Sequence, residues 1–414
     1  MTVTAERPAT PDWVATDFLT PAFFADPYPF YDRLLAEAPV VWSEQIGAWL
    51  VSPFDEVGVG LSDLRLSSGA RIPTLATTLS PAARERNAEA IACMARMMSF
   101  RDAPDHTRLR RLVSRAFTAR RVAGLSDEIE AIVARLVAAF PVGQPFDLRT
   151  AFAFPLPAMV ICRMLGIDEV HLASVRRWSE AVVTLLSSAT MTDAAADAAQ
   201  AAVLEADAFI AQALTERAKS PRDDLLTALA QARDDGDALT GDEITAMVIL
   251  LFFAGFETTE GLIGNGARVL MSHPHLRRAL ADDPARAEPF VEEVLRWDPS
   301  IHRQSRVSPV DTVIAGTPIR AGEPILFMIG AAGRDPRRFT DPGVFNPDRA
   351  DAGNVGFGHG AHFCLGAPLA RLESRIALRA LAQLPTPLAP AGPVAYGALL
   401  AVRKPEAMPV IIPA

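Results

Sequence analysis

One long apolar segment constrains the fold of this chain more than any other feature. Residues 240–243, Thr-Gly-Asp-Glu, have the form of a capping box, in which threonine and glutamate side chains satisfy backbone N–H groups at a helix start. We expect this helix to run to about Met271, roughly 45 Å at 1.5 Å per residue. Residues 246–256 are apolar on every side of it, which is typical of a helix enclosed in the centre of a large protein.

Helical periodicity also dominates the rest of the sequence. Half of the 414 residues are hydrophobic, which is enough to bury a large core. Short β-branched pieces between the helical stretches predict small sheets, so the fold class is mainly α with small β-sheets. The predicted helices are 27–37, 107–117, 126–140, 194–218, 240–272, 287–297 and 368–384, and the predicted strands are 40–42 with 49–51, 312–315 with 324–328, and 410–412.

The sequence contains no obvious domain boundary. It has neither a repeat nor a low-complexity linker, and its 33 prolines are scattered at the ends of elements. We therefore expect one compact domain over 26–414, preceded by an N-terminal extension, 1–25. Residues 67–98 are the least regular internal region, and they are a candidate mobile loop over a site.

Charge and hydropathy limit the partners of the protein. A net charge of −9 argues against nucleic-acid binding, which needs a positive face. The polar amino terminus lacks an apolar signal segment, and the longest apolar run is far shorter than the roughly 20 residues that span a bilayer. We expect a cytoplasmic protein that binds neither nucleic acid nor membrane.

Three cysteines are too few, and odd in number, for a disulfide framework. Cys93 and Cys162 lie in apolar stretches, where a thiol is usually a small core side chain. Cys364 lies instead in the segment 357–366, Phe-Gly-His-Gly-Ala-His-Phe-Cys-Leu-Gly, just before a predicted helix. The glycines let the backbone turn tightly and approach a flat partner, and the free N–H groups of a helix start favour a thiolate.

Several interpretations of Cys364 compete on the residues alone. It can be a buried thiol in a glycine-rich turn, because cysteine is among the most buried residue types. It can bind zinc with His359 and His362, although structural zinc usually takes four ligands and no fourth lies nearby. An iron–sulfur cluster normally needs four thiolates, and covalent haem needs a C-x-x-C-H motif that the sequence lacks.

The segment 357–366 matches the F-x-x-G-x-x-x-C-x-G loop of the cytochrome P-450 family, and the chain resembles that family from about Asp26 to Ile412. The resemblance implies the cytochrome P-450 fold, with the long central helix over a non-covalent haem b. It also implies that Cys364 is the thiolate ligand of the iron, whose electron donation favours O–O cleavage. Phe357 and Gly358 belong to the loop that holds the haem.

The long helix contains a second candidate site in residues 254–259, Ala-Gly-Phe-Glu-Thr-Thr. On an α-helix, Ala254 and Thr258 share one face and, with Gly255, leave a groove where a planar ligand can lie close. Glu257 points about 100° away, so a proton passes between the acid and the hydroxyl only through water. Taken singly, Thr258 can bond back to a helix carbonyl, and Glu257 can be a structural ion pair.

These residues resemble the acid–alcohol motif of the same family, with glutamate where many members have aspartate. The resemblance implies that Thr258 hydrogen-bonds dioxygen and that Glu257 belongs to the proton supply. Family members that use peroxide directly usually lack this pair. The pair therefore favours monooxygenation with two electrons delivered from outside.

Haem propionates need cationic or hydrogen-bonding partners when they are buried. His106 and Arg110 are four residues apart on a predicted helix and can reach one group together. The resemblance implies that they bind the propionates with Arg306 and His362. Arg303 is close enough in sequence to leave the choice between it and Arg306 open.

Glu293 and Arg296 lie three residues apart on one helix face, and an exposed pair of this kind would contribute little. The resemblance implies instead a buried E-x-x-R pair, joined by Arg349, that acts as scaffold and not in the chemistry.

The sequence carries no flavin or iron–sulfur signature, so we expect electrons from a separate ferredoxin and ferredoxin reductase. Arginines recur in two helices, either as a positive patch that steers an acidic ferredoxin or as ordinary solvated helix faces. They are Arg108, Arg111, Arg115, Arg120 and Arg121 in one stretch, and Arg371, Arg375 and Arg379 in the other.

The substrate is expected to be a small hydrophobic molecule, such as a terpenoid, steroid, macrolide or aromatic compound of secondary metabolism. By resemblance, its pocket is lined by residues from the 67–98 segment, from 182–186, and by Leu250, Ala254, Ile301, His302 and Ala398.

The sequence thus predicts a haem-thiolate monooxygenase that inserts one oxygen atom from dioxygen by hydroxylation, epoxidation or dealkylation. The same scaffold can also catalyse coupling, desaturation or rearrangement without oxygen insertion. A helical zinc-binding protein is the remote alternative.

Overall fold

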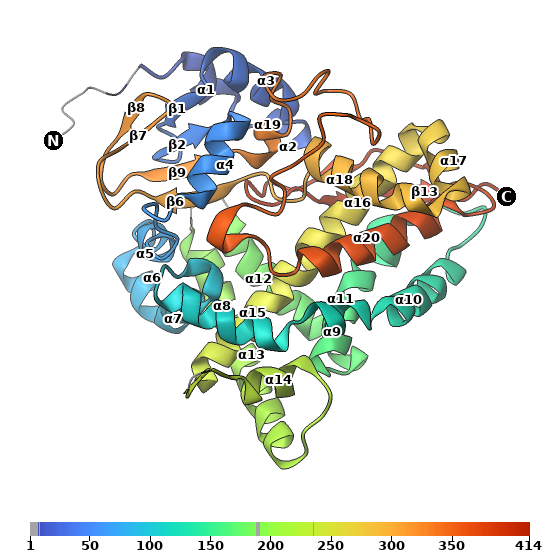
Figure 1. Ribbon diagram of the computed structural model, residues 1–414, viewed down its shortest axis with the longest axis horizontal. Coiled ribbons are helices and arrows are strands. Elements are labelled where there is room, and N and C mark those ends of the chain that lie inside the picture. The colour runs from blue at the N-terminus through green and yellow to red at the C-terminus, as the bar shows by residue number, and fades with distance from the viewer. Residues whose placement is uncertain (1–6, 8, 188–190, 235) are drawn as a thin grey trace. The chain divides into compact units, whose positions relative to one another are not determined.

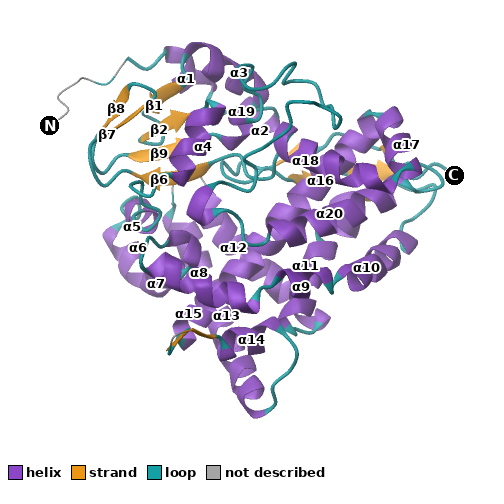
Figure 2. Ribbon diagram, viewed as in Figure 1, coloured by secondary structure: helices purple, strands orange, loops and turns teal. Residues whose placement is uncertain are grey.

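The computed structural model describes residues 7, 9–187, 191–234 and 236–414, and its elements are shown in Figures 1 and 2. Contacts within the chain divide it into two compact units. Unit 1 comprises Met1–Ser67, Glu130–Phe154 and Thr258–Ala414, and unit 2 comprises Ser68–Ile129 and Pro155–Glu257. Each unit combines segments that are far apart in the sequence, so no single linker separates them.

Unit 1 contains a four-stranded sheet in the order β1-β2-β9-β6. β1 (Val40–Ser43) and β2 (Ala48–Val51) form the predicted antiparallel pair, β9 (Pro324–Phe327) joins β2 in parallel, and β6 (Gln304–Val307) pairs with β9. Trp42, Trp49 and Phe327 are buried in the core of this sheet. Helix α4 (Phe54–Ser62) packs on it closely, because a Cβ at Gly60 would lie 2.2 Å from the Phe327 ring.

The helices of unit 1 pack around the second half of the long helix. α16 contacts α18 and α20, and Gly266 allows α20 to approach because a Cβ there would lie 2.6 Å from Leu378. The unit 1 helices, besides α4, are α1 (Asp12–Asp17), α2 (Pro21–Ala25), α3 (Tyr28–Glu37), α16 (Thr258–Ser272), α17 (Pro274–Asp282), α18 (Ala287–Trp297), α19 (Ile329–Ala332) and α20 (Ala367–Ala382). α10 (Ser126–Ala138) begins in unit 2 and ends in unit 1.

The predicted N-terminal extension, 1–25, contains α1 and α2. Val14, Phe18 and Phe23 from this segment are buried, so it is packed into unit 1. Residues 1–6 and 8 of the extension lie outside the described residues.

One predicted strand pairing is wrong. Residues 312–315 were expected to pair with 324–328, but β7 (Thr312–Ile314) pairs with β8 (Thr317–Ile319). Ala315 and Gly316 both have positive φ values, as in the two-residue turns that suit β-hairpins. The local turn therefore fixes the partner, and β9 is left free to join β2.

The remaining strands form three small sheets. Two lie in unit 1, and one lies in unit 2. They are β10-β13-β3 (Ala389–Pro390, Pro409–Ile411, Phe146–Asp147), β11-β12 (Ala395–Tyr396, Pro405–Ala407) and β4-β5 (Arg233–Asp234, Asp237–Ala238).

Unit 2 is almost entirely helical. Its helices are α5 (Arg71–Ala76), α6 (Pro81–Arg86), α7 (Ala88–Arg96), α8 (Asp105–Ala116), α9 (Ala119–Ala123), α11 (Pro155–Leu165), α12 (Leu172–Ser187), α13 (Asp193–Lys219), α14 (Leu225–Gln231) and α15 (Gly241–Phe252). The segment 67–98, expected to be the least regular internal region, contains three of them. Pro81 stands at the start of α6, where a missing N–H costs no helix bond, and Ser80 caps that helix. Pro81 therefore starts a helix instead of breaking one.

The long helix extends from Gly241 to Ser272, as predicted, and its capping box is present. Thr240 Oγ1 accepts from the N–H of Glu243 (3.2 Å), and the Glu243 carboxylate accepts from the N–H of Thr240 (2.9 Å). This helix is long and apolar enough to cross a membrane, but most of its apolar stretch is buried inside the protein, as expected of a core helix.

Two glycines of α4 provide a matched test of the packing on the sheet. Gly60→Ala is expected to destabilise the protein by about 1–3 kcal/mol, because the added methyl group overlaps the Phe327 ring. Gly58 faces open space on the same helix, so Gly58→Ala is expected to stabilise by about 0.5–1 kcal/mol. Urea unfolding of both variants measures the difference, and equal effects would contradict this packing.

Candidate functional site

Cys364 lies in a tight loop whose backbone is fixed by a hydrogen bond and by glycine conformations. Its N–H donates to the carbonyl of Phe357 (3.0 Å) and closes the loop. Gly358 and Gly360 have φ values of +74° and +70°, in the left-handed region that favours glycine. A Cβ at Gly360 would also lie 2.8 Å from the backbone of α4. The third loop glycine, Gly366, has an ordinary φ of −80°.

The surroundings of Cys364 differ from those of the other two cysteines. Burial raises the pKa of Cys93 and Cys162 to about 12, so both remain thiols in the core. Cys364 is partly exposed and stands just before the first turn of α20, where a helix start favours a thiolate. Hydrogen bonding to Glu292 raises the pKa of the nearby Arg371, and the charge at Cys364 adds to this effect.

The loop histidines lie at the two ends of a 3-10 turn, Gly360–His362, which His359 precedes and His362 ends. His359 Nδ1 lies 2.8 Å from Ser62 Oγ, which turns this ring toward α4. His362 is partly buried within the turn. Across the part of the chain that the structure describes, no three His, Cys, Asp or Glu side chains are grouped as metal ligands.

The long helix is not α-helical through its middle. Residues Phe253–Glu257 form a π-helical segment between α15 and α16, and such segments occur frequently at functional sites. The spacing of 100° per residue expected for Glu257 therefore does not hold here, because the π turn is wider. A Cβ at Gly255 would lie 2.6 Å from Ile161 on α11, so packing within unit 2 also requires this glycine.

An accessible strip interrupts the burial of the long helix at this point. Ala254 is exposed and Thr258 is half-buried, whereas Phe256 and Thr259 are buried. Glu257 is 1% exposed. The helix is thus accessible at Ala254 and Thr258, whereas the neighbouring acid, Glu257, is buried.

Glu257 is held by a residue that the sequence did not single out. Ser179 on α12 donates from Oγ to Glu257 Oε1 (3.3 Å), and both side chains are buried. The two residues are far apart in the sequence, and a lone serine in a helix carries no signal of such a contact. Thr258 begins α16 in unit 1, directly after this acid.

The predicted propionate partners are distributed over both units. His106 is buried on α8 in unit 2, and Arg110 lies one turn later on the same helix. Arg306 lies on β6 in unit 1 and is 3% exposed. Arg303 is also buried, and this burial lowers its pKa to about 10 although the nearby Tyr31 acts in the opposite direction. His362 lies in the cysteine loop.

The structure brings Glu293, Arg296 and Arg349 together. Arg296 donates from Nε and Nη2 to the two oxygens of Glu293 (2.8 and 2.7 Å), and Arg349 Nε lies 3.1 Å from the same carboxylate. Arg296 also donates to the carbonyls of Gly333 and Val344. This buried network ties α18 to the chain that leads to the cysteine loop.

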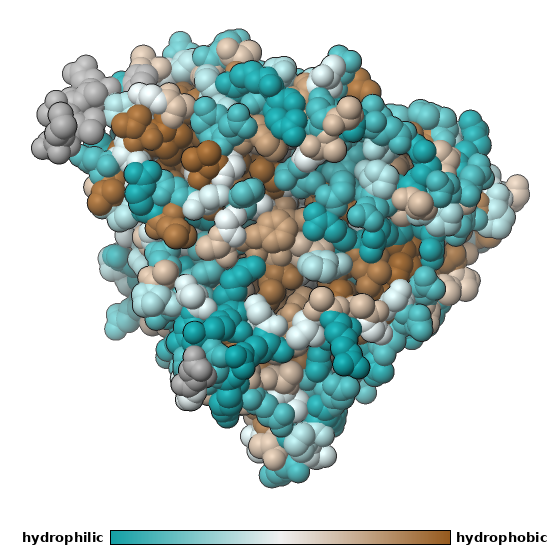
Figure 3. Space-filling model, in the orientation of Figure 1, coloured by the Kyte–Doolittle hydropathy of each residue, from teal (hydrophilic) through white to brown (hydrophobic). Residues whose placement is uncertain are grey.

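The arginines of the predicted positive patch are largely neutralised within the chain. In unit 2, Arg111 and Arg115 both contact the buried Asp234. The other pairs are Arg108 with Glu243 and Asp237, Arg121 with Asp223, Arg371 with Glu292, Arg375 with Glu288 and Arg379 with Glu130. The space-filling view shows a mostly hydrophilic face with scattered apolar groups (Figure 3).

The predicted pocket residues lie in different environments. Leu250 is buried in α15, and Ala398 is exposed. Ile301 forms an isolated β-bridge with Val402. His302 is 4% exposed. Its Nδ1 lies 3.0 Å from the Tyr31 hydroxyl, and its Nε2 lies 3.5 Å from Oδ1 of Asp298, the residue that follows α18.

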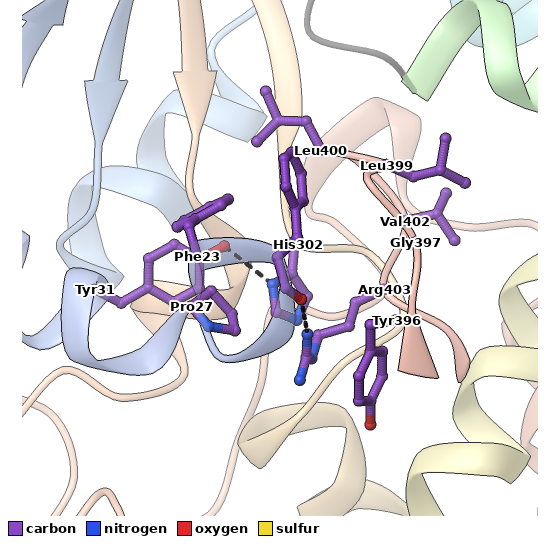
Figure 4. Close-up of a pocket in the computed structure, with 11 residues that line it drawn as sticks. Phe23, Pro27, Tyr31, His302, Tyr396, Gly397, Leu399, Leu400, Val402 and Arg403 are labelled. Carbon is purple, nitrogen blue, oxygen red and sulfur yellow. Dashed lines mark hydrogen bonds between the residues drawn. The ribbon is translucent and has the colours of Figure 1, made fainter. Parts of the chain in front are cut away.

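His302 also lines a small pocket in unit 1 (Figure 4). Phe23, Pro27 and Tyr31 lie on one side of it, and Arg403 lies on the other. Its volume is about 20 Å³, enough for roughly one water molecule and not for an organic substrate.

Comparison with known proteins agrees with this geometry. Residues 81–287 and 286–383 match the cytochrome P-450 family. The chain is 41% identical to cytochrome P450 monooxygenase PikC of Streptomyces venezuelae over 87% of its length and 84% of the relative. It is 37% identical to 6-deoxyerythronolide B hydroxylase of Saccharopolyspora erythraea, over 88% of this chain and 90% of that one.

A solved structure supports the same assignment. The crystal structure of P450BioI in complex with hexadec-9Z-enoic acid ligated acyl carrier protein has a TM-score of 0.87 and 32% identity, covering 95% of this chain and 99% of that one. The predicted fold is therefore confirmed, and the zinc interpretation of Cys364 has no support. The chain belongs to the cytochrome P-450 family of haem-thiolate enzymes, and it is a monooxygenase.

Proposed function

We propose that this enzyme binds non-covalent haem b through Cys364 and inserts one oxygen atom of dioxygen into a hydrophobic small molecule. A haem held by a thiolate activates dioxygen and favours cleavage of its O–O bond. The observation that carries the proposal is the partly exposed Cys364 in a left-handed glycine loop at the start of α20. The residues present fit the group, because this loop offers a partly exposed sulfur at a helix start and, at Gly358, a backbone that no side chain covers.

The long helix supplies the polar groups of the reaction. Thr258 lies on the accessible strip, and its hydroxyl is proposed to hydrogen-bond dioxygen. Glu257 lies beside it in the chain and is buried, and Ser179 fixes one of its oxygens. We assign Glu257 to the supply of protons, which reach the Thr258 hydroxyl through water. We propose that the π segment, which is wider than an α-helix, accommodates that water.

Four cationic or hydrogen-bonding side chains are proposed to hold the haem propionates. His106 and Arg110 extend from one helix, Arg306 comes from a strand and His362 comes from the cysteine loop. Arg306 is preferred over Arg303, because Arg306 lies within strand β6, whereas Arg303 precedes the strand and lies near Tyr31.

Electrons are proposed to come from a separate ferredoxin and its reductase in the cytoplasm. The ion pairs of the two arginine-rich helices reduce the positive charge available for steering. Arg111 and Arg115 both contact the buried Asp234, so charge reversal there would disturb unit 2 itself. Arg375 is a better probe of docking because its partner Glu288 is exposed.

The substrate is proposed to be a hydrophobic compound of secondary metabolism that contacts Leu250, Ala254, Ile301 and Ala398. The similarity to 6-deoxyerythronolide B hydroxylase supports a substrate of that type. A screen of 6-deoxyerythronolide B, hexadec-9Z-enoic acid and testosterone for displacement of iron-bound water, followed by product analysis under ¹⁸O₂, tests the assignment. One labelled oxygen atom in the product is expected, whereas an unlabelled product would indicate coupling, desaturation or rearrangement.

Replacement of the proposed ligand tests the haem assignment. The reduced, carbon-monoxide-bound wild type is expected to show the red-shifted absorption band of sulfur-bound haem. Cys364→His is expected to lose this band while retaining haem, because imidazole can also bind iron. Cys93→Ala is the matched control, since burial keeps that thiol out of the chemistry. A red-shifted band in Cys364→His would contradict the assignment.

Variants of the hydroxyl test the role of Thr258. Thr258→Ala is expected to lower product formation by roughly 10²-fold, the lower end of what a positioned proton-transfer group contributes. Electron consumption should continue and yield hydrogen peroxide, while Thr258→Ser should restore most of the product. The product formed per electron pair is the measurement. Equal yields from the alanine and serine variants would show that the hydroxyl has no part in the reaction.

A further inference from the structure

The two segments proposed to contact substrate in unit 1 are hydrogen-bonded to each other. The chain leaves β11 at Tyr396 and returns in β12 at Pro405, and the turn between them contains Ala398. His302 N donates to the carbonyl of Ala401 (2.9 Å), and Arg403 N donates to that of Ser300 (2.7 Å). The turn and the Ile301 segment therefore move together, and a contact that fixes the position of one also fixes the position of the other.

Arg403 ties the turn to a buried carboxylate after α18. Its Nε donates to Asp298 Oδ1 (3.0 Å), which also accepts from the Tyr28 hydroxyl (2.6 Å). Arg268 from α16 donates to Asp298 Oδ2 (2.6 Å). Burial alone would raise the pKa of Asp298, but Arg403, His302 and Arg268 outweigh it and hold this pKa well below its usual value. Asp298 is thus a fixed anion, and the turn is bound to it through Arg403.

Lys404 ties the turn to a second buried carboxylate, on the long helix. Its Nζ donates to Glu260 Oε2 (3.2 Å), and Arg149 holds the other oxygen of Glu260. Glu260 lies two residues after Thr258 and is 1% exposed. Successive side chains of an extended segment point in opposite directions, so Arg403 and Lys404 bind two different anchors.

Glycines on the long helix let the turn approach it at backbone distance. A Cβ at Gly261 would lie 2.9 Å from the carbonyl oxygen of Arg403, and one at Gly264 would lie 3.1 Å from Pro405. The segment 403–405 therefore crosses α16 on a bare face. The distance between this segment and α16 is set by backbone contact and by the two ion pairs.

The other side of the turn borders a small pocket. The pocket of about 20 Å³ is lined by Leu399, Leu400 and Val402 of the turn and by Tyr31 across from them (Figure 4). A turn with this space behind it can shift when an anchor is removed.

We propose that Arg403 and Lys404 are positioning residues that fix the turn 397–402 relative to Thr258 and so determine which carbon of the substrate is oxidised. This inference rests on the proposed function, in which Ile301 and Ala398 contact the substrate. A displacement of about 1 Å can change a rate by up to roughly 10²-fold, so a small shift of the turn redistributes the products.

We call the two ion pairs of Arg403 and Lys404 the clamp. Lys404→Met tests it without unfolding the protein, because Glu260 keeps its contact with Arg149. The first measurement is hydrogen exchange of the full-length protein. Amides of residues 397–402 are expected to exchange several-fold faster in Lys404→Met than in wild type, and Lys404→Arg is expected to restore protection. Unchanged exchange in Lys404→Met would overturn the clamp.

The second measurement is the ratio of oxidised positions on testosterone and 6-deoxyerythronolide B. This ratio is expected to change by at least about threefold in Lys404→Met and to return in Lys404→Arg, because the turn moves relative to Thr258. Arg217→Met is the matched control, since Arg217 and Asp224 form a buried ion pair in unit 2 (2.7 Å). That variant should lose stability and keep the wild-type ratio.

The outcomes separate the two claims. A wild-type ratio in Lys404→Met, with active enzyme, would overturn the assignment of specificity. Absence of any product from the wild type would contradict the proposed function, and the exchange measurement would still decide whether the clamp exists.

Discussion

The backbone of residues 357–366 is held in one conformation by two left-handed glycines and by the hydrogen bond from Cys364 to Phe357. This conformation places a thiol outside the core and beside a helix start, where negative charge is favoured. The other two cysteines are buried and stay protonated. The proposed chemistry depends on this contrast, because only an accessible thiolate can bind iron.

Buried carboxylates bound by arginine or lysine recur through unit 1 and position its functional segments. Glu293 joins Arg296 and Arg349, Asp298 joins Arg268 and Arg403, and Glu260 joins Arg149 and Lys404. Each of these carboxylates has two cationic partners, so it keeps one partner when the other is replaced. These networks connect α16 and α18 to the cysteine loop and to the C-terminal turn. The fold therefore holds its proposed reactive groups through charges that take no part in the reaction.

Features encoded within a few residues could be predicted from the sequence. The capping box at Thr240, the glycine loop around Cys364 and the E-x-x-R spacing depend on local geometry, and the long helix has the expected bounds. Contacts between distant residues could not be predicted. Neither the Ser179–Glu257 hydrogen bond nor the Arg403–Asp298 ion pair is indicated by the residues that neighbour it in the sequence. The π segment was missed because its residues also suit an α-helix, and the β7–β8 hairpin because its Ala-Gly turn was not recognised.

The central claim is that a single sulfur of this chain binds haem iron. X-ray absorption at the iron edge of the purified, haem-supplemented protein measures the atoms next to the metal directly. The account predicts one sulfur neighbour together with the four porphyrin nitrogens, and loss of that sulfur when Cys364 is replaced. An iron surrounded only by nitrogen and oxygen in the wild-type protein would contradict it.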